Sequence, residues 1–202
     1  MTIRLFRPCF FAGWFYPKAL FRIKTTEKIL CLTFDDGPDP ATTPELLDIL
    51  DQYHVRAIFF CNGQAAEKYP FLVEKIKEEG HIAGNHGFAH ANGWKTNTED
   101  YCEDVNHASR FLPGSYFRPP YGRITYSQYK LLCKKFKIVF WDLMAYDFDP
   151  DFGAARSLLV LRRKVRNGSL IVLHDRPGSS SNTLLSEFLD SAIKNGYRFV
   201  LP

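Results

Sequence analysis

The chain has 202 residues, of which 46% are hydrophobic and 24% charged, and its formal net charge is +4. This length and mixture are typical of one folded domain, and they exclude a disordered chain or a second domain of useful size. The basic residues are scattered without a long run, so the charge pattern gives no indication of nucleic-acid binding.

The five cysteines lie at irregular spacings, and no CxxC pair occurs among them. An odd count without metal-ligand spacing favours reduced thiols over a disulfide framework. The N-terminus also lacks a convincing signal peptide, because its apolar stretch is short and has no clear cleavage site. Together these features predict a cytoplasmic protein.

Residues 1–27 form a basic and aromatic segment ahead of the first expected strand. Its aromatic stretch, residues 9–16, is too short to span a membrane. Two arrangements remain open: the segment packs on the domain and covers its underside, or residues 1–16 rest on a membrane surface. Because aromatic side chains are usually buried, we expect packing on the domain formed by residues 28–202.

Short apolar runs alternate with amphipathic stretches along the rest of the chain. The apolar runs predict strands at residues 29–34, 55–60, 81–84, 116–117, 138–141, 170–173 and 197–201. The amphipathic stretches predict helices at residues 42–50, 65–79, 98–111, 127–136, 154–166 and 183–194, with Thr42 and Thr98 as N-caps. About seven alternations imply a parallel sheet, either open and doubly wound or closed into a barrel.

Nearly every expected strand is followed by a residue able to do chemistry. Active sites of barrels and open α/β sheets lie at the carboxyl ends of the strands, so one site can draw on all of these residues. The residues in these positions are Asp35, Asp36, Asn62, Asn85, His86, Arg118, Asp142, Asp147, His174 and Asp175.

A metal site is the first chemistry that this pattern indicates. His86 and His90 are four residues apart, so one helical turn or a tight loop can point both imidazoles the same way. With Asp36 as a third ligand they would form a two-histidine, one-carboxylate site with open positions. An ion there would lower the pKa of a bound water toward neutrality, which suits hydrolysis.

Acid–base residues complete this scheme. Asp35 is adjacent to the expected ligand Asp36 and is free to act as a base. His174 could protonate a leaving group, with Asp147 fixing its tautomer and raising its pKa. Arg118 could pair with Asp35.

Five motifs resemble those of polysaccharide deacetylases, the NodB homology domain of carbohydrate esterase family four. They read TFDDGP (33–38), NHGFAH (85–90), RPPYG (118–122), WDLMAYDF (141–148) and LIVLHD (170–175). Their order and spacing cover residues 29–200. The resemblance implies an α/β fold, a distorted (β/α)7 barrel of the NodB type formed by a single domain.

The resemblance also implies the ligands and the base. Asp36, His86 and His90 would bind a divalent ion, zinc foremost, with cobalt, nickel and manganese as alternatives. Asp35 would be the general base, and Arg118 would orient it.

The same resemblance implies the acid and the substrate contacts. His174, tuned by Asp147, would be the general acid, and the backbone N–H of Tyr121 would help to stabilise the oxyanion. The residues expected at the substrate are Pro119, Tyr121, Trp141, Phe148 and Val172. The motifs depart from the family pattern at Phe148, Met144 and Val172, where tryptophan, aspartate and leucine are usual, so the substrate stays open.

The predicted function is removal of acetyl groups from an N- or O-acetylated sugar, without a nucleic-acid partner. One alternative is an amidase of the same fold that acts on a non-sugar C–N bond. Another is an inactive carbohydrate-binding relative, although the sequence keeps the expected ligands and base. A non-haem iron oxygenase shares the two-histidine, one-carboxylate set, but its usual all-β setting does not fit the strand–helix alternation.

Overall fold

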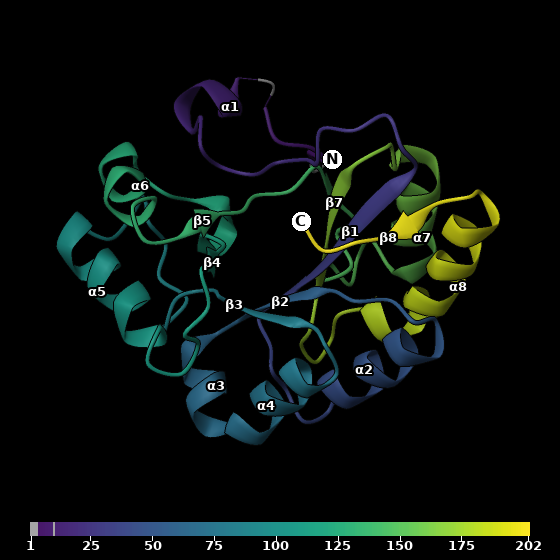
Figure 1. Cartoon of the computed structure of the whole chain (residues 1–202), viewed down its shortest axis with the longest axis horizontal. Helices are drawn as coiled ribbons and strands as arrows, with labels where there is room; N and C mark the ends of the chain where they lie inside the picture. Colours follow the sequence, from purple (N-terminus) through teal and green to yellow (C-terminus); the bar gives the residue numbers. More distant parts are fainter. Residues whose placement is uncertain (1–3, 10) are drawn as a thin grey trace.

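A single sheet of parallel strands forms the centre of the protein, and helices surround it (Figure 1). The computed structural model describes residues 4–9 and 11–202, so expectations for residues 1–3 and Phe10 lie outside it. The strand order is β5-β4-β3-β2-β1-β7-β6, with β8 paired to β1. The strands are β1 (Ile29–Asp35), β2 (Ile58–Cys61), β3 (Ile82–Asn85), β4 (Tyr116–Phe117), β5 (Lys137–Ile138), β6 (Leu143–Met144), β7 (Ser169–His174) and β8 (Arg198–Phe199).

The helices cover the outer side of this sheet (Figure 1). They are α1 (Ala12–Phe15), α2 (Thr43–Gln52), α3 (Gly63–Lys68), α4 (Pro70–Glu78), α5 (Thr98–Ala108), α6 (Tyr126–Leu132), α7 (Ala154–Lys164) and α8 (Ser181–Lys194), with a short 3-10 helix at Pro120–Gly122. The apolar faces of α2 to α8 pack with the strands into the hydrophobic core, whereas α1 has no buried residue. The predicted α/β barrel is confirmed. Within the described residues, no helix has both the length and the apolar character needed to cross a bilayer.

Strand β1 is the centre of the sheet. It pairs with β7 from Leu30 to Asp35, while its other edge pairs with β8 at its start and with β2 at its end. A strand buried on both faces must be almost wholly apolar, which explains its sequence, ILCLTFD. Because all these strands run parallel, their carboxyl ends meet on one side of the sheet.

Two expected elements differ from the structure. The helix expected over 65–79 is two helices, α3 and α4, because Pro70 lacks an N–H donor and forces Tyr69 out of helical geometry. The strand expected over 138–141 ends early at Ile138, and β6 follows as an unexpected strand. Beyond Ile138, Val139 still donates its N–H to the carbonyl of Phe117, and on its other edge it forms an isolated bridge with Leu20 of the N-terminal segment.

The expected cap at Thr98 was wrong, and the threonine at the start of α2 makes no capping hydrogen bond. Asn97, not Thr98, caps α5, because its side chain accepts a hydrogen bond from the N–H of Asp100. Thr42 occupies the N-cap position of α2, but its hydroxyl donates to the carboxylate of Asp175 at 2.6 Å. A long-range acceptor therefore takes the place of the local capping bond.

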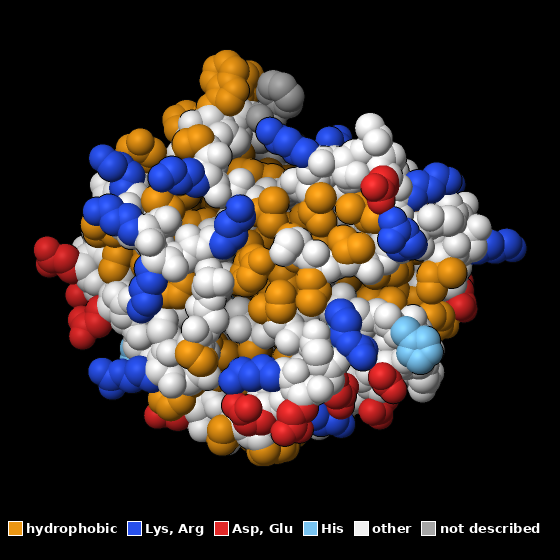
Figure 2. All heavy atoms as spheres, viewed as in Figure 1, with side chains coloured by type: hydrophobic (Ala, Val, Ile, Leu, Met, Phe, Trp, Pro, Cys, Tyr) orange, Lys and Arg blue, Asp and Glu red, His pale blue; other side chains and the backbone are white. Residues whose placement is uncertain are grey.

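The N-terminal segment runs along two parts of the barrel. Residues 20–23 pair with Val139 and with the start of β7 at Ser169, where β5 and β6 leave the sheet open among the described residues. Residues 4–9 run beside β6, where the N–H of Met144 donates to the carbonyl of Phe6 at 2.9 Å. Helix α1 lies between these stretches and projects from the molecule at the top of Figures 1 and 2, with exposed Trp14 and Phe15.

Candidate metal centre and active site

The three expected metal ligands lie together at the carboxyl ends of the strands. Asp36 follows β1, whereas His86 and His90 follow β3. The ligand atoms of these residues all lie within 4.8 Å of one another. The Nε2 atoms of His90 and His86 are 3.2 and 3.7 Å from Oδ1 of Asp36. One divalent ion could therefore be bound by all three.

His86 has the protonation that a metal ligand needs. Its Nδ1 lies 2.8 Å from the backbone carbonyl of Arg118, and a carbonyl can only accept, so Nδ1 carries the hydrogen. The lone pair of Nε2 then faces Asp36, as in metal sites where a second hydrogen bond orients the imidazole. Burial also lowers the pKa of His86 to about 4, which keeps the ring neutral. The donor set thus fits a divalent ion.

Asp36 supplies the negative charge of this site. Burial acts to raise its pKa, but the hydrogen bond to His90 and the neighbouring histidines, which are protonated in the acidic range where Asp36 titrates, outweigh burial and hold the pKa below its ordinary value. Its backbone adopts φ = 81°, and His90 adopts φ = 55°, a left-handed region that non-glycine residues rarely occupy. Such conformations cost about 1–3 kcal/mol each and cluster at functional sites.

Asp35 forms the expected ion pair with Arg118. The guanidinium is fully buried, and its Nη1 donates to Oδ1 of Asp35 at 2.6 Å and to Oγ1 of Thr33 at 2.7 Å. Its Nη2 donates to the carbonyl of Phe140 at 2.8 Å. The other oxygen of Asp35 lies 3.9 Å from Nε2 of His86. One carboxylate oxygen is therefore held in place, while the other faces the metal-binding residues.

His174 and Asp147 form the second expected pair. Nδ1 of His174 lies 3.0 Å from Oδ1 of Asp147, and the backbone N–H of His174 donates to Oδ2 at 2.7 Å. Burial acts to lower the pKa of His174, but the charge and the hydrogen bond of Asp147 outweigh burial and raise it. The ring of Phe148 packs edge-on against the imidazole at 4.6 Å between centroids. This arrangement favours a protonated imidazole.

The three metal-binding residues, Asp35 and His174 border one cavity of about 540 Å³. Of the expected substrate residues, Tyr121, Trp141 and Phe148 line it. Pro119 and Val172 are buried and do not belong to the cavity lining. Val172 has no exposed surface, because it lies in the middle of β7 between β1 and β6.

The turn after β4 places a backbone donor in this cavity wall. Tyr121 adopts φ = 59°, and its N–H has no hydrogen-bond partner among the described residues. Gly122 follows at φ = 65°, and a Cβ there would collide with the indole of Trp141. Glycine therefore allows Trp141 to lie against the turn that carries the unpaired N–H of Tyr121.

Sequence reasoning missed part of the cavity wall. The N-terminal segment contributes Leu5, Arg7, Pro8 and Cys9, for which no local pattern gave a signal. Arg123 and Arg176 also line the cavity, and Nη1 of Arg176 lies 3.5 Å from Oδ2 of Asp36. These two arginines each follow a motif residue by two positions, and that spacing could have indicated them.

Asp175 has a structural role next to the metal-binding residues. Its carboxylate accepts hydrogen bonds from the hydroxyls of Thr42 and Thr43, each at 2.6 Å. A Cβ at Gly37 would collide with the same carboxylate, so only glycine fits there. Asp175 thus fixes the loop between Asp36 and α2.

Comparison with known proteins gives several clear matches. A family model described as polysaccharide deacetylase matches residues 22–135. A peptidoglycan-N-acetylglucosamine deacetylase from Bacillus cereus is 36% identical over 85% of this chain and 66% of its own length. A second protein of that description from Bacillus cereus is 33% identical over 89% of each chain. The chain thus spans just under two thirds of the first relative and most of the second.

Solved structures agree with these matches. The Bc1960 peptidoglycan N-acetylglucosamine deacetylase, in complex with 4-naphthalen-1-yl-N-oxidanyl-benzamide, has a TM-score of 0.86, with 33% identity over 91% of this chain and 90% of that one. The peptidoglycan deacetylase PdaC from Bacillus subtilis has a TM-score of 0.79, with 27% identity over 87% and 88%. A pseudoenzyme from Bacillus anthracis has a TM-score of 0.80 but 20% identity over 89% of this chain and 65% of that one, which shows the fold alone.

Proposed function

The chain belongs to the polysaccharide deacetylase family, and on this premise we propose that it hydrolyses the acetamide of an N-acetylated sugar with the help of a divalent metal ion. The relatives are named for peptidoglycan sugars, which supports an amino-sugar substrate. Products would be acetate and the free amino sugar.

One observation carries this proposal. The ligand atoms of Asp36, His86 and His90 lie within 4.8 Å of one another, and Asp35 and His174 border the same cavity. A base and an acid on either side of a metal site are what amide hydrolysis needs, because water must lose a proton and the leaving amine must gain one.

Asp36, His86 and His90 would hold the ion. When bound, a divalent ion polarises the acetyl carbonyl and activates water for attack. We expect zinc, because two imidazoles and one carboxylate with open positions suit it; cobalt, nickel and manganese accept the same donors.

Asp35 would take the proton of the attacking water as the new C–O bond forms. Its ion pair with Arg118 holds the carboxylate in one orientation, so the oxygen that faces the metal-binding residues is the one available to act as base. The free N–H of Tyr121 would donate to the negative oxygen that develops on the acetyl carbon. Preorganised donors of this kind are worth about 3–4 kcal/mol in acyl transfer.

His174 would complete the reaction as the C–N bond breaks. The leaving nitrogen must gain a proton to depart as an amine, and Asp147 favours the protonated imidazole that supplies it. Asp147 accepts from Nδ1, so Nε2 is the nitrogen left to donate toward the cavity.

Acetate release tests this proposal. We would incubate the protein with N-acetylglucosamine oligomers and peptidoglycan fragments, after chelation and again after zinc is added. Asp35→Asn should lower the rate by about 10²- to 10⁴-fold, because it keeps the shape but removes the base. Asp190→Asn is the matched control, since Asp190 is exposed on α8 and contacts Tyr53.

Metal-dependent acetate release that is lost in Asp35→Asn and kept in Asp190→Asn would support the proposal. Ammonia or another amine released from a non-sugar amide, without acetate, would instead identify an amidase of the same fold. If the ion is bound and no substrate is turned over, the proposal of a deacetylase is wrong.

A cytoplasmic location stays a prediction. It is supported by the thiols, since all five cysteines are free in the structure, as is usual in a reducing compartment. Cell fractionation with an antibody to the protein would test it.

A further inference from the structure

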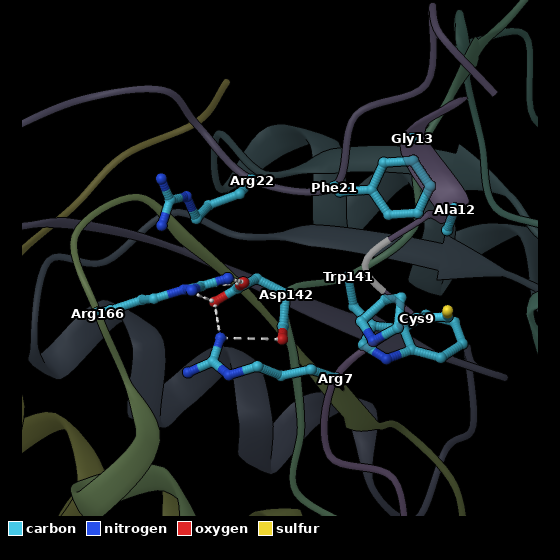
Figure 3. A pocket seen from close by; sticks show the side chains of 10 residues that line it. Arg7, Cys9, Ala12, Gly13, Phe21, Arg22, Trp141, Asp142 and Arg166 are labelled. Atoms are coloured by element: carbon cyan, nitrogen blue, oxygen red, sulfur yellow. Dashed lines mark hydrogen bonds and ion pairs between the residues drawn. The ribbon is translucent and has the colours of Figure 1, made fainter. Parts of the chain in front are cut away.

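A second pocket of about 370 Å³ adjoins the active-site cavity, and the N-terminal segment builds most of it (Figure 3). The two cavities share Arg7, Pro8, Cys9 and Trp141 in their walls. A substrate that places one unit at the metal-binding residues can therefore reach the second pocket with a neighbouring unit.

The second pocket is positively charged. Its charged side chains are Arg7, Arg22, Arg166 and Asp142, a net charge of +2. Asp142 is buried, and its carboxylate accepts hydrogen bonds from both Arg7 and Arg166 (Figure 3). Although burial acts to raise the pKa of Asp142, these arginines lower it further than burial raises it, so Asp142 stays ionised and neutralises only one guanidinium.

Arg22 is the arginine without an acidic partner. It is half-buried, its backbone pairs with Ser169, and its side chain forms no ion pair or hydrogen bond with the described residues. In Figure 3, dashed lines join Arg7 and Arg166 to Asp142, whereas none reaches Arg22. A planar guanidinium that has no ion pair within the protein is suited to bind a carboxylate or phosphate.

Two aromatic rings also line this pocket, those of Phe21 and Trp141. Aromatic surfaces with a few polar donors are typical of small-ligand sites of this volume.

We propose that this pocket is a subsite for an anionic sugar unit, one that carries a carboxylate or phosphate and is linked to the unit being deacetylated. The proposal rests on the proposed deacetylase function. Arg22 binds the anion, and the rings of Phe21 and Trp141 border the same unit. The N-terminal segment is then a specificity-determining part of the enzyme.

The test compares neutral and anionic disaccharides. The substrates are di-N-acetylchitobiose, its 1-phosphate, and the disaccharide of N-acetylglucosamine with N-acetylmuramic acid, which carries a carboxylate. The ratio of kcat/KM for an anionic substrate to that for the neutral one should exceed unity in the wild type. In Arg22→Gln it should fall about fivefold to tenfold, mainly through KM, as expected for loss of a partly exposed charged hydrogen bond.

Two further variants test whether the preference depends on the charge of residue 22 and on its position. Arg22→Lys keeps the charge and should retain part of the preference. Arg198→Gln, at an exposed arginine paired with Glu27, should leave the ratio unchanged. A preference for only the 1-phosphate or only the muramic acid disaccharide would identify which anion the subsite binds.

Equal kcat/KM for neutral and anionic substrates in the wild type would overturn the subsite, as would an equal loss on all three substrates in Arg22→Gln. If no disaccharide is turned over, the deacetylase proposal fails separately. The subsite is then judged by calorimetry: tighter binding of an anionic disaccharide that Arg22→Gln removes supports it, and equal binding of the neutral and anionic disaccharides refutes it.

Discussion

Asp35 and His174 are register partners at the last positions of the two central strands, β1 and β7. The backbone continues this pairing, since the N–H of Asp175 donates to the carbonyl of Asp35 at 2.8 Å. The expected base and acid are therefore fixed relative to each other by a sheet rather than by two loops. Sites built on regular elements hold their geometry more precisely than sites on loops.

The pair of His174 and Asp147 leads to a prediction about pH dependence. Asp147 raises the pKa of His174, and the proposed mechanism requires a protonated His174, so activity should fall as pH rises through this pKa. In Asp147→Asn the pKa falls, so the alkaline limb of the kcat/KM profile should move to lower pH. The rate at the optimum should fall by about 10²-fold or more.

The measurement is a full pH–rate profile of both proteins with the same metal content. Asp149→Asn serves as a control, because Asp149 pairs with Arg4 at 2.6 Å and does not contact His174. An alkaline limb in the same place for Asp147→Asn and the wild type would rule out His174 as the acid tuned by Asp147.

Arg118→Met should destabilise the protein strongly. The side chain is fully buried, and its loss leaves the carboxylate of Asp35 and the carbonyl of Phe140 without their donors. Removing one partner of a buried ion pair costs about 3–5 kcal/mol. Urea unfolding should show this loss of unfolding free energy.

Arg198→Met is the control for that change. Arg198 pairs with Glu27 at 2.8 Å on the surface, and exposed pairs contribute about 0–1 kcal/mol. Similar losses in the two variants would contradict the structural importance of the buried pair.

Metal binding should stabilise the wild type and not His90→Ala. A ligand that binds only the folded state at about 100 times its Kd adds about 2.7 kcal/mol. For a chain of this size that corresponds to a rise in Tm of about 5–10 °C. Thermal unfolding of chelated protein, with and without added zinc, measures the effect.

His54→Asn is the matched histidine control, because His54 is exposed in the turn after α2 and does not belong to the group of possible metal ligands. We expect its Tm to rise with zinc as in the wild type. An equal rise in His90→Ala would mean that the ion binds elsewhere.

Cys9 should react first with a maleimide, and the reaction should block activity. Cys9 is exposed in the wall of both cavities, whereas Cys31 and Cys61 are buried. Burial raises the pKa of Cys31 to about 12 and also raises that of Cys61, so neither supplies thiolate at neutral pH. A bulky label should lower activity more than a small one, and an excess of a slowly processed oligosaccharide should slow the labelling.

Mass spectrometry of the modified peptide and parallel assays of acetate release measure both effects. Labelled Cys9→Ser protein should keep the activity that it had before labelling. Full activity after complete labelling of Cys9 would show that substrate does not approach this part of the wall.

Local patterns in the sequence were enough to predict a parallel sheet with the main chemical groups at one edge, whereas the barrel was implied by the family motifs. Each apolar run marks a buried strand, and the polar residue that follows it must lie at the carboxyl end of that strand. Asp36, His86 and His90 therefore meet because of their positions after β1 and β3, and His174 borders the same cavity from the last position of β7. Residue type and position relative to a strand are local properties that a sequence shows directly.

Only the tertiary structure decided the rest of the cavity wall. Arg7 and Asp142, which are 135 residues apart, hold the N-terminal segment beside the site, and Val139 pairs with Leu20 of the same segment. Val172, expected at the substrate, is covered within the sheet. The physical reason is that such contacts depend on which surfaces remain open after the barrel has formed, and no periodicity or spacing along the chain records that.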